Sequence, residues 1–139
     1  MTKKLQLGQL GENLACEYLV KNNYKIIERN FRQPWGEIDI IAKKSDKTLV
    51  FIEVKTMTEN SATGLKPEDQ LSTSKLEKVK RTASLYANYY PELVNKNKGW
   101  QIDLIALTIQ GTSGSTLSKS NGLTINGKSC SINYYENIA

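Results

Sequence analysis

The segment GEIDIIAKKSDKTLVFIEVK, residues 36–55, constrains the fold more than any other part of this chain. Two runs of strand-forming residues, 36–43 and 48–56, flank a polar stretch at 44–47, which is typical of a β-hairpin. A three-residue loop at 45–47 fixes the register, because a slip by one residue would bury acids and expose isoleucines. The expected partners are Lys44 with Thr48, Ala42 with Val50, Ile40 with Ile52 and Ile38 with Val54, the last three pairs forming a fully apolar face.

The opposite face of this hairpin carries charged side chains. The same register puts Asp39 directly opposite Glu53, with Cβ atoms about 5 Å apart. Lys55 projects from the same face, roughly 6.6 Å along the strand from Glu53. Facing carboxylates repel each other, and a cation between them would relieve the repulsion. We therefore expect Asp39 and Glu53 to bind a divalent metal ion, the alternative for Asp39 being an ordinary solvent-exposed strand position.

Two interpretations of Lys55 follow from its neighbours. It could be a strand-end lysine that protects the strand edge from further pairing, or it could pair with Glu37, which the register places opposite it. Alternatively, its ammonium group could orient an attacking water and stabilise negative charge on a phosphate. In that case Glu37 would contact and position Lys55 rather than bind the metal ion.

The composition limits the chemistry available to the chain. It contains no histidine, which excludes Ser-His-Asp and Cys-His catalysis and histidine-based zinc sites. A catalytic metal would have oxygen ligands, which favours Mg²⁺ or Mn²⁺. The net charge of +5 permits binding to nucleic acid without requiring it. Cys16 and Cys130 lack metal-ligand or redox spacing, and we expect both to be reduced.

The order of elements predicts one α/β domain over residues 1–139 with a mixed central sheet. A polar segment at 57–68 and a Ser/Gly-rich segment at 110–122 are expected to be flexible loops. The expected elements are a helix at 5–22, a strand at 24–31, a turn at 33–36, the hairpin, a helix from Ser72 or Thr73 to Tyr89, a strand at 100–109, and a small C-terminal hairpin from 123–125 and 131–138.

The hydropathy pattern contains no membrane or export signal. No apolar run approaches the ~20 residues that span a bilayer. The first residues, MTKKLQLGQLGENL, lack a continuous apolar region and a cleavage site for a signal peptide. We expect a cytoplasmic protein with no membrane partner.

Further polar residues on the helices could belong to the site. Glu12 could simply favour the start of the first helix, or it could reach the metal, because nearby Gly8 and Gly11 suggest close approach to another element. The second helix carries a row of basic residues that is either a solvated face or a phosphate-binding surface. This row consists of Lys75, Lys78 and Arg81, with Lys75 nearest the site.

Three other residues have open interpretations. Asp103 interrupts an apolar strand, where it could orient a basic group or mark an exposed strand end. Trp35 and Trp100 fit core or turn packing better than base stacking.

The ordered motifs resemble those of a known family. GQLGENLACEYL, IIERNFR, GEIDIIA, VFIEVKT, a lysine early in the second helix and the ending INYYENIA are similar to the YraN family of small bacterial proteins. Glu12, Asp39 and the Glu53-Val54-Lys55 triplet also resemble the PD-(D/E)XK nuclease superfamily, especially its Holliday-junction resolvase branch. Ile38 stands where the literal motif has proline.

This resemblance implies a restriction-endonuclease-like αβββαβ core. It implies that Asp39 and Glu53 are metal ligands, that Lys55 is the catalytic lysine and that Glu12 is an auxiliary acid. The expected function is Mg²⁺-dependent endonucleolytic cleavage of DNA, with branched or junction DNA as a candidate substrate. A non-catalytic nucleic-acid-binding module with the nuclease fold is the alternative. Symmetric cutting of a junction needs two sites, which a homodimer would provide.

Overall fold

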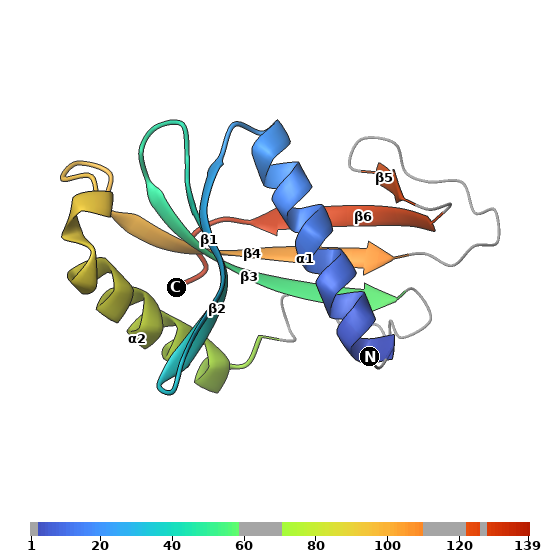
Figure 1. The fold of residues 1–139 in the computed structure, drawn as a ribbon, viewed down its shortest axis with the longest axis horizontal. Coiled ribbons are helices and arrows are strands. Elements are labelled where there is room, and N and C mark those ends of the chain that lie inside the picture. Colours follow the sequence, from blue (N-terminus) through green and yellow to red (C-terminus); the bar gives the residue numbers. More distant parts are fainter. Residues whose placement is uncertain (1–2, 59–70, 110–121, 126–127) are drawn as a thin grey trace.

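In the computed structural model, a mixed six-stranded sheet runs through the molecule in the order β1-β2-β3-β4-β6-β5 (Figure 1). The structure describes residues 3–58, 71–109, 122–125 and 128–139. The pairing of β3 with β4 is parallel and the other pairings are antiparallel, as expected for a hairpin followed by a helical crossover. The α/β class and the αβββαβ order of the core are confirmed.

The element bounds agree closely with the predicted ones. The first helix begins two residues and ends one residue earlier than predicted, the first hairpin strand has its predicted bounds, and the last strand lies three residues earlier than predicted. Met57 and Thr58 belong to the second hairpin strand rather than to the predicted 57–68 loop. The rest of that loop, and 110–121 of the second predicted loop, lie outside the described residues. The elements are α1 (Lys3–Lys21), β1 (Lys25–Gln33), β2 (Gly36–Lys43), β3 (Leu49–Thr58), α2 (Thr73–Tyr89), the 3₁₀ helix η3 (Pro91–Leu93), β4 (Trp100–Ile109), β5 (Gly122–Ile125) and β6 (Lys128–Tyr135).

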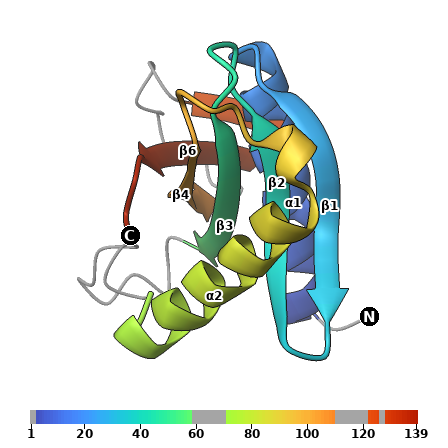
Figure 2. The same cartoon turned by 90° about the vertical axis from the view of Figure 1, so that its left-hand side faces the viewer.

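Two helices cover opposite faces of the sheet (Figure 2). On the α1 side, Leu14 and Leu19 pack against Ile40 and Ile52. On the α2 side, Val79, Ala83 and Tyr86 pack against residues of β2 and β3 that include Ile41 and Phe51. Alternate strand residues therefore serve different cores, which explains why β3 is apolar on both faces up to Ile52. In the described part of the chain, neither α-helix has the length and apolar character needed to cross a bilayer.

The hairpin register is confirmed from the turn to its middle. Ile40 pairs with Ile52 and Ala42 with Val50. The regular ladder ends there, and the expected pairing of Ile38 with Val54 is wrong. Ile38 packs instead in the α2-side core, so the predicted apolar face does not continue to Ile38.

Candidate active site

The end of the β2–β3 ladder brings the predicted acidic pair together. Regular alternation would give the Val54 N–H a backbone acceptor on β2. Instead this N–H donates to Oδ2 of Asp39 at 2.8 Å. The Asp39 carboxylate therefore lies where β2 separates from β3, and it also interacts with the side chain of Glu53. The prediction that Asp39 and Glu53 meet is supported, although a side-chain bond, not regular pairing, holds Asp39.

Glu53 is a buried acidic residue. Its residue is only 4% exposed. Burial, followed by the charge of Asp39, raises the pKa of Glu53 to about 8. Two cations oppose this shift: Lys75, whose Nζ lies 3.5 Å from Glu53 Oε2, and Lys55. These two ammonium groups do not offset the burial and the neighbouring carboxylate, so the site favours additional positive charge.

Glu12 approaches Asp39 from the α1 side. Both residues, together with Lys55, line a cavity of about 710 Å³. Burial and then the charge of Asp39 raise the pKa of Glu12. Its Oε1 lies 3.6 Å from Arg29 Nη2, too far for a hydrogen bond, and is a buried oxygen without a hydrogen-bond partner among the described residues. Asp39 thus interacts with both Glu12 and Glu53.

A close contact between α1 and β3 fixes the position of Glu12. A Cβ added at Gly11 would overlap the hydroxyl of Thr56 and lie 2.9 Å from its Cβ. A Cβ added at Gly8 would meet nothing within 4 Å. The predicted close approach is therefore confirmed at Gly11 and wrong at Gly8.

These two glycines give a matched pair of variants. Gly11→Ala should destabilise the protein by roughly 1–3 kcal/mol because Thr56 and α1 must move apart. Gly8→Ala should be neutral or stabilising by up to about 1 kcal/mol, because alanine favours the helix. Urea unfolding of both variants measures the difference. Equal effects at the two positions would contradict the close packing of Gly11 on Thr56.

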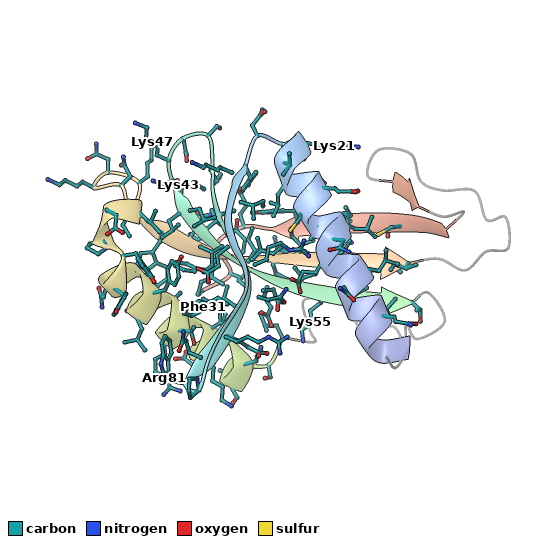
Figure 3. The ribbon with its side chains drawn as sticks, in the orientation of Figure 1. Lys21, Phe31, Lys43, Lys47, Lys55 and Arg81 are labelled. Carbon is teal, nitrogen blue, oxygen red and sulfur yellow. The ribbon has the colours of Figure 1, made fainter. Side chains whose placement is uncertain are left out.

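Two arginines that were not among the predicted site residues also line this cavity, beside Lys55. Arg29 and Arg32 come from β1, and Lys55 comes from β3. Arg29 is held in place, since its Nη2 donates to Asn13 Oδ1 at 2.6 Å. Figure 3 shows Lys55 on β3, between α1 and α2 in that view. The sequence signal was weak, because arginines on an edge strand usually point to solvent.

The α2 side of the site differs from the expected pattern at one point. Glu37 has its Oε1 3.9 Å from Lys75 Nζ, so the pairing of Glu37 with Lys55 is replaced by one with Lys75. The expectation that Lys75 lies nearest the site is supported by its contact with Glu53. Ser72 accepts a hydrogen bond from the Lys75 N–H and caps α2, which fixes the start of the basic row.

Asp103 does not belong to this site, and both interpretations of it were wrong. It is fully buried and accepts hydrogen bonds from the Tyr134 hydroxyl, from the Asn137 N–H at 2.8 Å and from Gln101 Nε2 at 2.9 Å. Its partners come mainly from the C-terminal segment, so Asp103 anchors that segment to the sheet.

The donor chemistry of the acidic pair fits a hard divalent cation. Asp39 and Glu53 offer carboxylate oxygens, the ligands that Mg²⁺ and Mn²⁺ prefer. Among the described residues, no group of three or more His, Cys, Asp or Glu side chains is placed to hold a metal. Of the residues that the structure describes, Asp39 and Glu53 would supply two ligands, and water or substrate oxygens commonly provide further ligands for Mg²⁺.

The raised pKa of Glu53 predicts a pH-dependent stability. Between the ordinary value of 4.5 and the native value of about 8, the unfolded chain releases this proton while the native protein keeps it. The Glu53 contribution therefore falls as the pH rises through this window. In the absence of metal, the free energy of unfolding of Glu53→Gln, relative to that of wild type, should rise by roughly 3 kcal/mol between pH 5.5 and pH 8.5. Urea unfolding at both pH values measures this, and a pH-independent difference would contradict the buried, raised-pKa state.

The comparisons with known proteins give the family. The chain belongs to the uncharacterised protein family UPF0102, whose sequence pattern matches residues 11–107. It is 44% identical over 101 residues to a UPF0102 protein of Campylobacter jejuni, covering 72% of this chain and 81% of the relative. It is 41% identical over 100 residues to one of Fervidobacterium nodosum, covering 71% of each.

A third relative, the UPF0102 protein of Corynebacterium efficiens, is 36% identical over 115 residues, covering 81% of this chain and 86% of the relative. The YraN resemblance is thus confirmed at the level of the family. Membership of the nuclease superfamily stays a prediction. The matched residues include all the acidic and basic residues of the site and end before the C-terminal hairpin.

Proposed function

We propose that this protein is a Mg²⁺- or Mn²⁺-dependent endonuclease that hydrolyses phosphodiester bonds in DNA, with branched or junction DNA as its substrate. The observation that most supports this is the buried acidic pair at the end of the β2–β3 ladder. The carboxylates of Glu53 and Asp39 lie together, and the positive charges of Lys75 and Lys55 do not offset the burial of Glu53 and its repulsion by Asp39. A cation-binding role explains why two acids share this place.

The neighbouring side chains fit the needs of phosphodiester hydrolysis. A divalent cation held by Asp39 and Glu53 would supply Lewis acidity and positive charge at a phosphoryl oxygen. Lys55 lines the cavity next to Asp39, where its ammonium would donate to a phosphate oxygen or position the attacking water. Arg29 and Arg32 line the same cavity and would bind the flanking phosphate oxygens. Glu12 would accept a hydrogen bond from a water through Oε1, which has no hydrogen-bond partner among the described residues.

The surface of α2 would bind the nucleic-acid backbone. Lys78 and Arg81 are exposed and follow Lys75 at three-residue intervals, and Figure 3 shows Arg81 on α2. Contacts of this kind release counterions, so DNA affinity should fall steeply with salt.

One observation favours a second function. Lys75 already pairs with Glu53 at 3.5 Å and provides a counter-ion from within the chain. A non-catalytic module that binds DNA would need no metal. Such a module would keep its DNA affinity when Asp39 is replaced and would show no metal-dependent turnover.

A substrate panel tests the proposal. Four-way junction, flap, single-stranded and linear duplex DNA are each incubated with Mg²⁺, with Mn²⁺ and with EDTA. We expect cleavage of branched substrates with either metal and none with EDTA. Salt-sensitive binding without cleavage under any condition would support the non-catalytic module instead.

We also propose a cytoplasmic location. Both cysteines are free thiols, and burial raises the pKa of Cys130 to about 11. Reduced cysteines of this kind are typical of that compartment.

A further inference from the structure

A second cavity lies between the β1–β2 turn and α2. It has a volume of about 450 Å³, in the size range of ligand pockets. It is distinct from the cavity at Glu12 and Lys55, with which it shares no lining residue. Its lining residues include Trp35, Glu37, Lys75, Lys78, Arg81 and Thr82. Lys75 connects it to the proposed active site, because it contacts both Glu37 and Glu53.

Trp35 lies at this cavity on a short turn that packs on α2. Gln33 pairs with Gly36, so residues 34–35 form a two-residue connection that begins with proline. A Cβ added at Gly36 would overlap the hydroxyl of Thr82, so the turn packs directly on α2. The Trp35 ring packs at an angle of 61° against Phe31, with the ring centres 5.9 Å apart, and the residue remains 44% exposed. A large aromatic side chain is thus held in place at the surface.

The cavity also carries uncompensated positive charge. Lys78 and Arg81 have no carboxylate partner in the described part of the chain, whereas Lys80 on the same helix pairs with Glu77. Lys75 is partly neutralised by its contacts with Glu37 and Glu53. A fixed aromatic ring next to two basic side chains suits the binding of single-stranded nucleic acid, in which bases stack on aromatic rings and phosphates contact basic side chains.

We propose that this cavity binds an unpaired nucleotide of the DNA substrate, with its base stacked on Trp35 and its phosphate held by Lys78 and Arg81. This inference rests on the proposed function, because it assigns the cavity to the same substrate. In a continuous duplex the base faces are covered by neighbouring bases, so Trp35 discriminates in favour of unpaired DNA. The preference for a branch point or single-stranded junction then comes from this cavity and not from the acidic pair.

DNA binding in EDTA tests the proposal without any cleavage step. The probes are a fluorescently labelled 12-nucleotide single strand and a blunt duplex of the same sequence. Trp35→Ala should weaken binding of the single strand by roughly 5- to 100-fold and leave duplex binding unchanged, while Trp35→Phe should retain most of the affinity. Tyr89→Ala is the matched control, because Tyr89 is a 79% exposed aromatic residue of α2 outside the cavity.

A second measurement reports stacking directly. The chain has two tryptophans, so Trp100→Phe leaves Trp35 as the sole one, and its fluorescence should be quenched by the single strand. Equal losses for single strand and duplex in Trp35→Ala, no loss, or an unquenched Trp35 would overturn the proposal. If the protein cleaves DNA with metal and Trp35→Ala binds the single strand as wild type does, the stacking proposal fails and the proposed nuclease function stands. If Trp35 stacks on the single strand but no substrate is cleaved, the proposed nuclease function fails and the stacking proposal stands.

Discussion

Asp39→Asn is expected to abolish metal-dependent DNA cleavage, with a loss of about 100-fold or more. The substitution keeps the size of the side chain and an oxygen acceptor for the Val54 N–H, so the strand geometry is retained. It removes the negative charge that the proposed cation needs. Lys55→Met should lose a similar amount of activity for a different reason, since it removes the positive charge but leaves both acids. Initial cleavage rates under single-turnover conditions measure both losses.

A control on α1 separates these effects from general changes in charge. Glu17→Gln removes an exposed acid on the helix that carries Glu12, and it should cleave at the wild-type rate. Metal binding distinguishes the two active-site variants, because Asp39→Asn should lose metal binding and Lys55→Met should keep it. Wild-type cleavage by Asp39→Asn would place the chemistry elsewhere on the chain.

Asp103→Ala is expected to produce the largest loss of stability, roughly 3–5 kcal/mol. The variant leaves the Tyr134 hydroxyl and the Asn137 N–H without their acceptor. The C-terminal segment should loosen, although the Ile138 N–H still donates to the Ile102 carbonyl oxygen at 2.9 Å. Urea unfolding gives the free energy, and hydrogen exchange at residues 137–138 reports the local change.

Two further variants identify the cause of that loss. Tyr134→Phe removes one donor and leaves the carboxylate, so it should cost roughly 1–2 kcal/mol. Asp103→Asn keeps the shape but turns an amide donor toward other donors, so its cost should lie between those of the other two. An Asp103→Ala protein as stable as wild type would show that the buried carboxylate does not anchor the segment.

The secondary structure could be predicted because local patterns are strong in this chain. The alternation around the 44–47 turn fixed the register of Ile40 with Ile52, and Ser72 marked the start of α2. The point at which β2 leaves β3 could not be predicted in the same way. Regular strand geometry continues the ladder, whereas here the Asp39 side chain takes the Val54 N–H that a backbone carbonyl would have accepted.

The two acidic residues of the candidate site could be predicted from the sequence better than the residues that surround them. Asp39 and Glu53 lie on the two strands of one hairpin, so strand-pairing rules predict that they meet, although in the structure the bond from the Val54 N–H to the Asp39 side chain replaces regular pairing. Lys75 lies on another element, and its contact with Glu53 depends on how α2 crosses the sheet. The burial of Asp103 depends on Tyr134, which is 31 residues further along the chain. Contacts of this kind follow from tertiary packing, which a local pattern does not encode.

Calorimetric titration of Mn²⁺ into the metal-free protein at pH 7 tests the central claim most directly. Because the pKa of Glu53 is about 8, wild type should bind the ion and release close to one proton, detected by comparing buffers of different ionisation enthalpy. Glu53→Gln should lose both the binding and the proton release. Binding of equal affinity in wild type and Glu53→Gln, or no binding in wild type, would contradict the account.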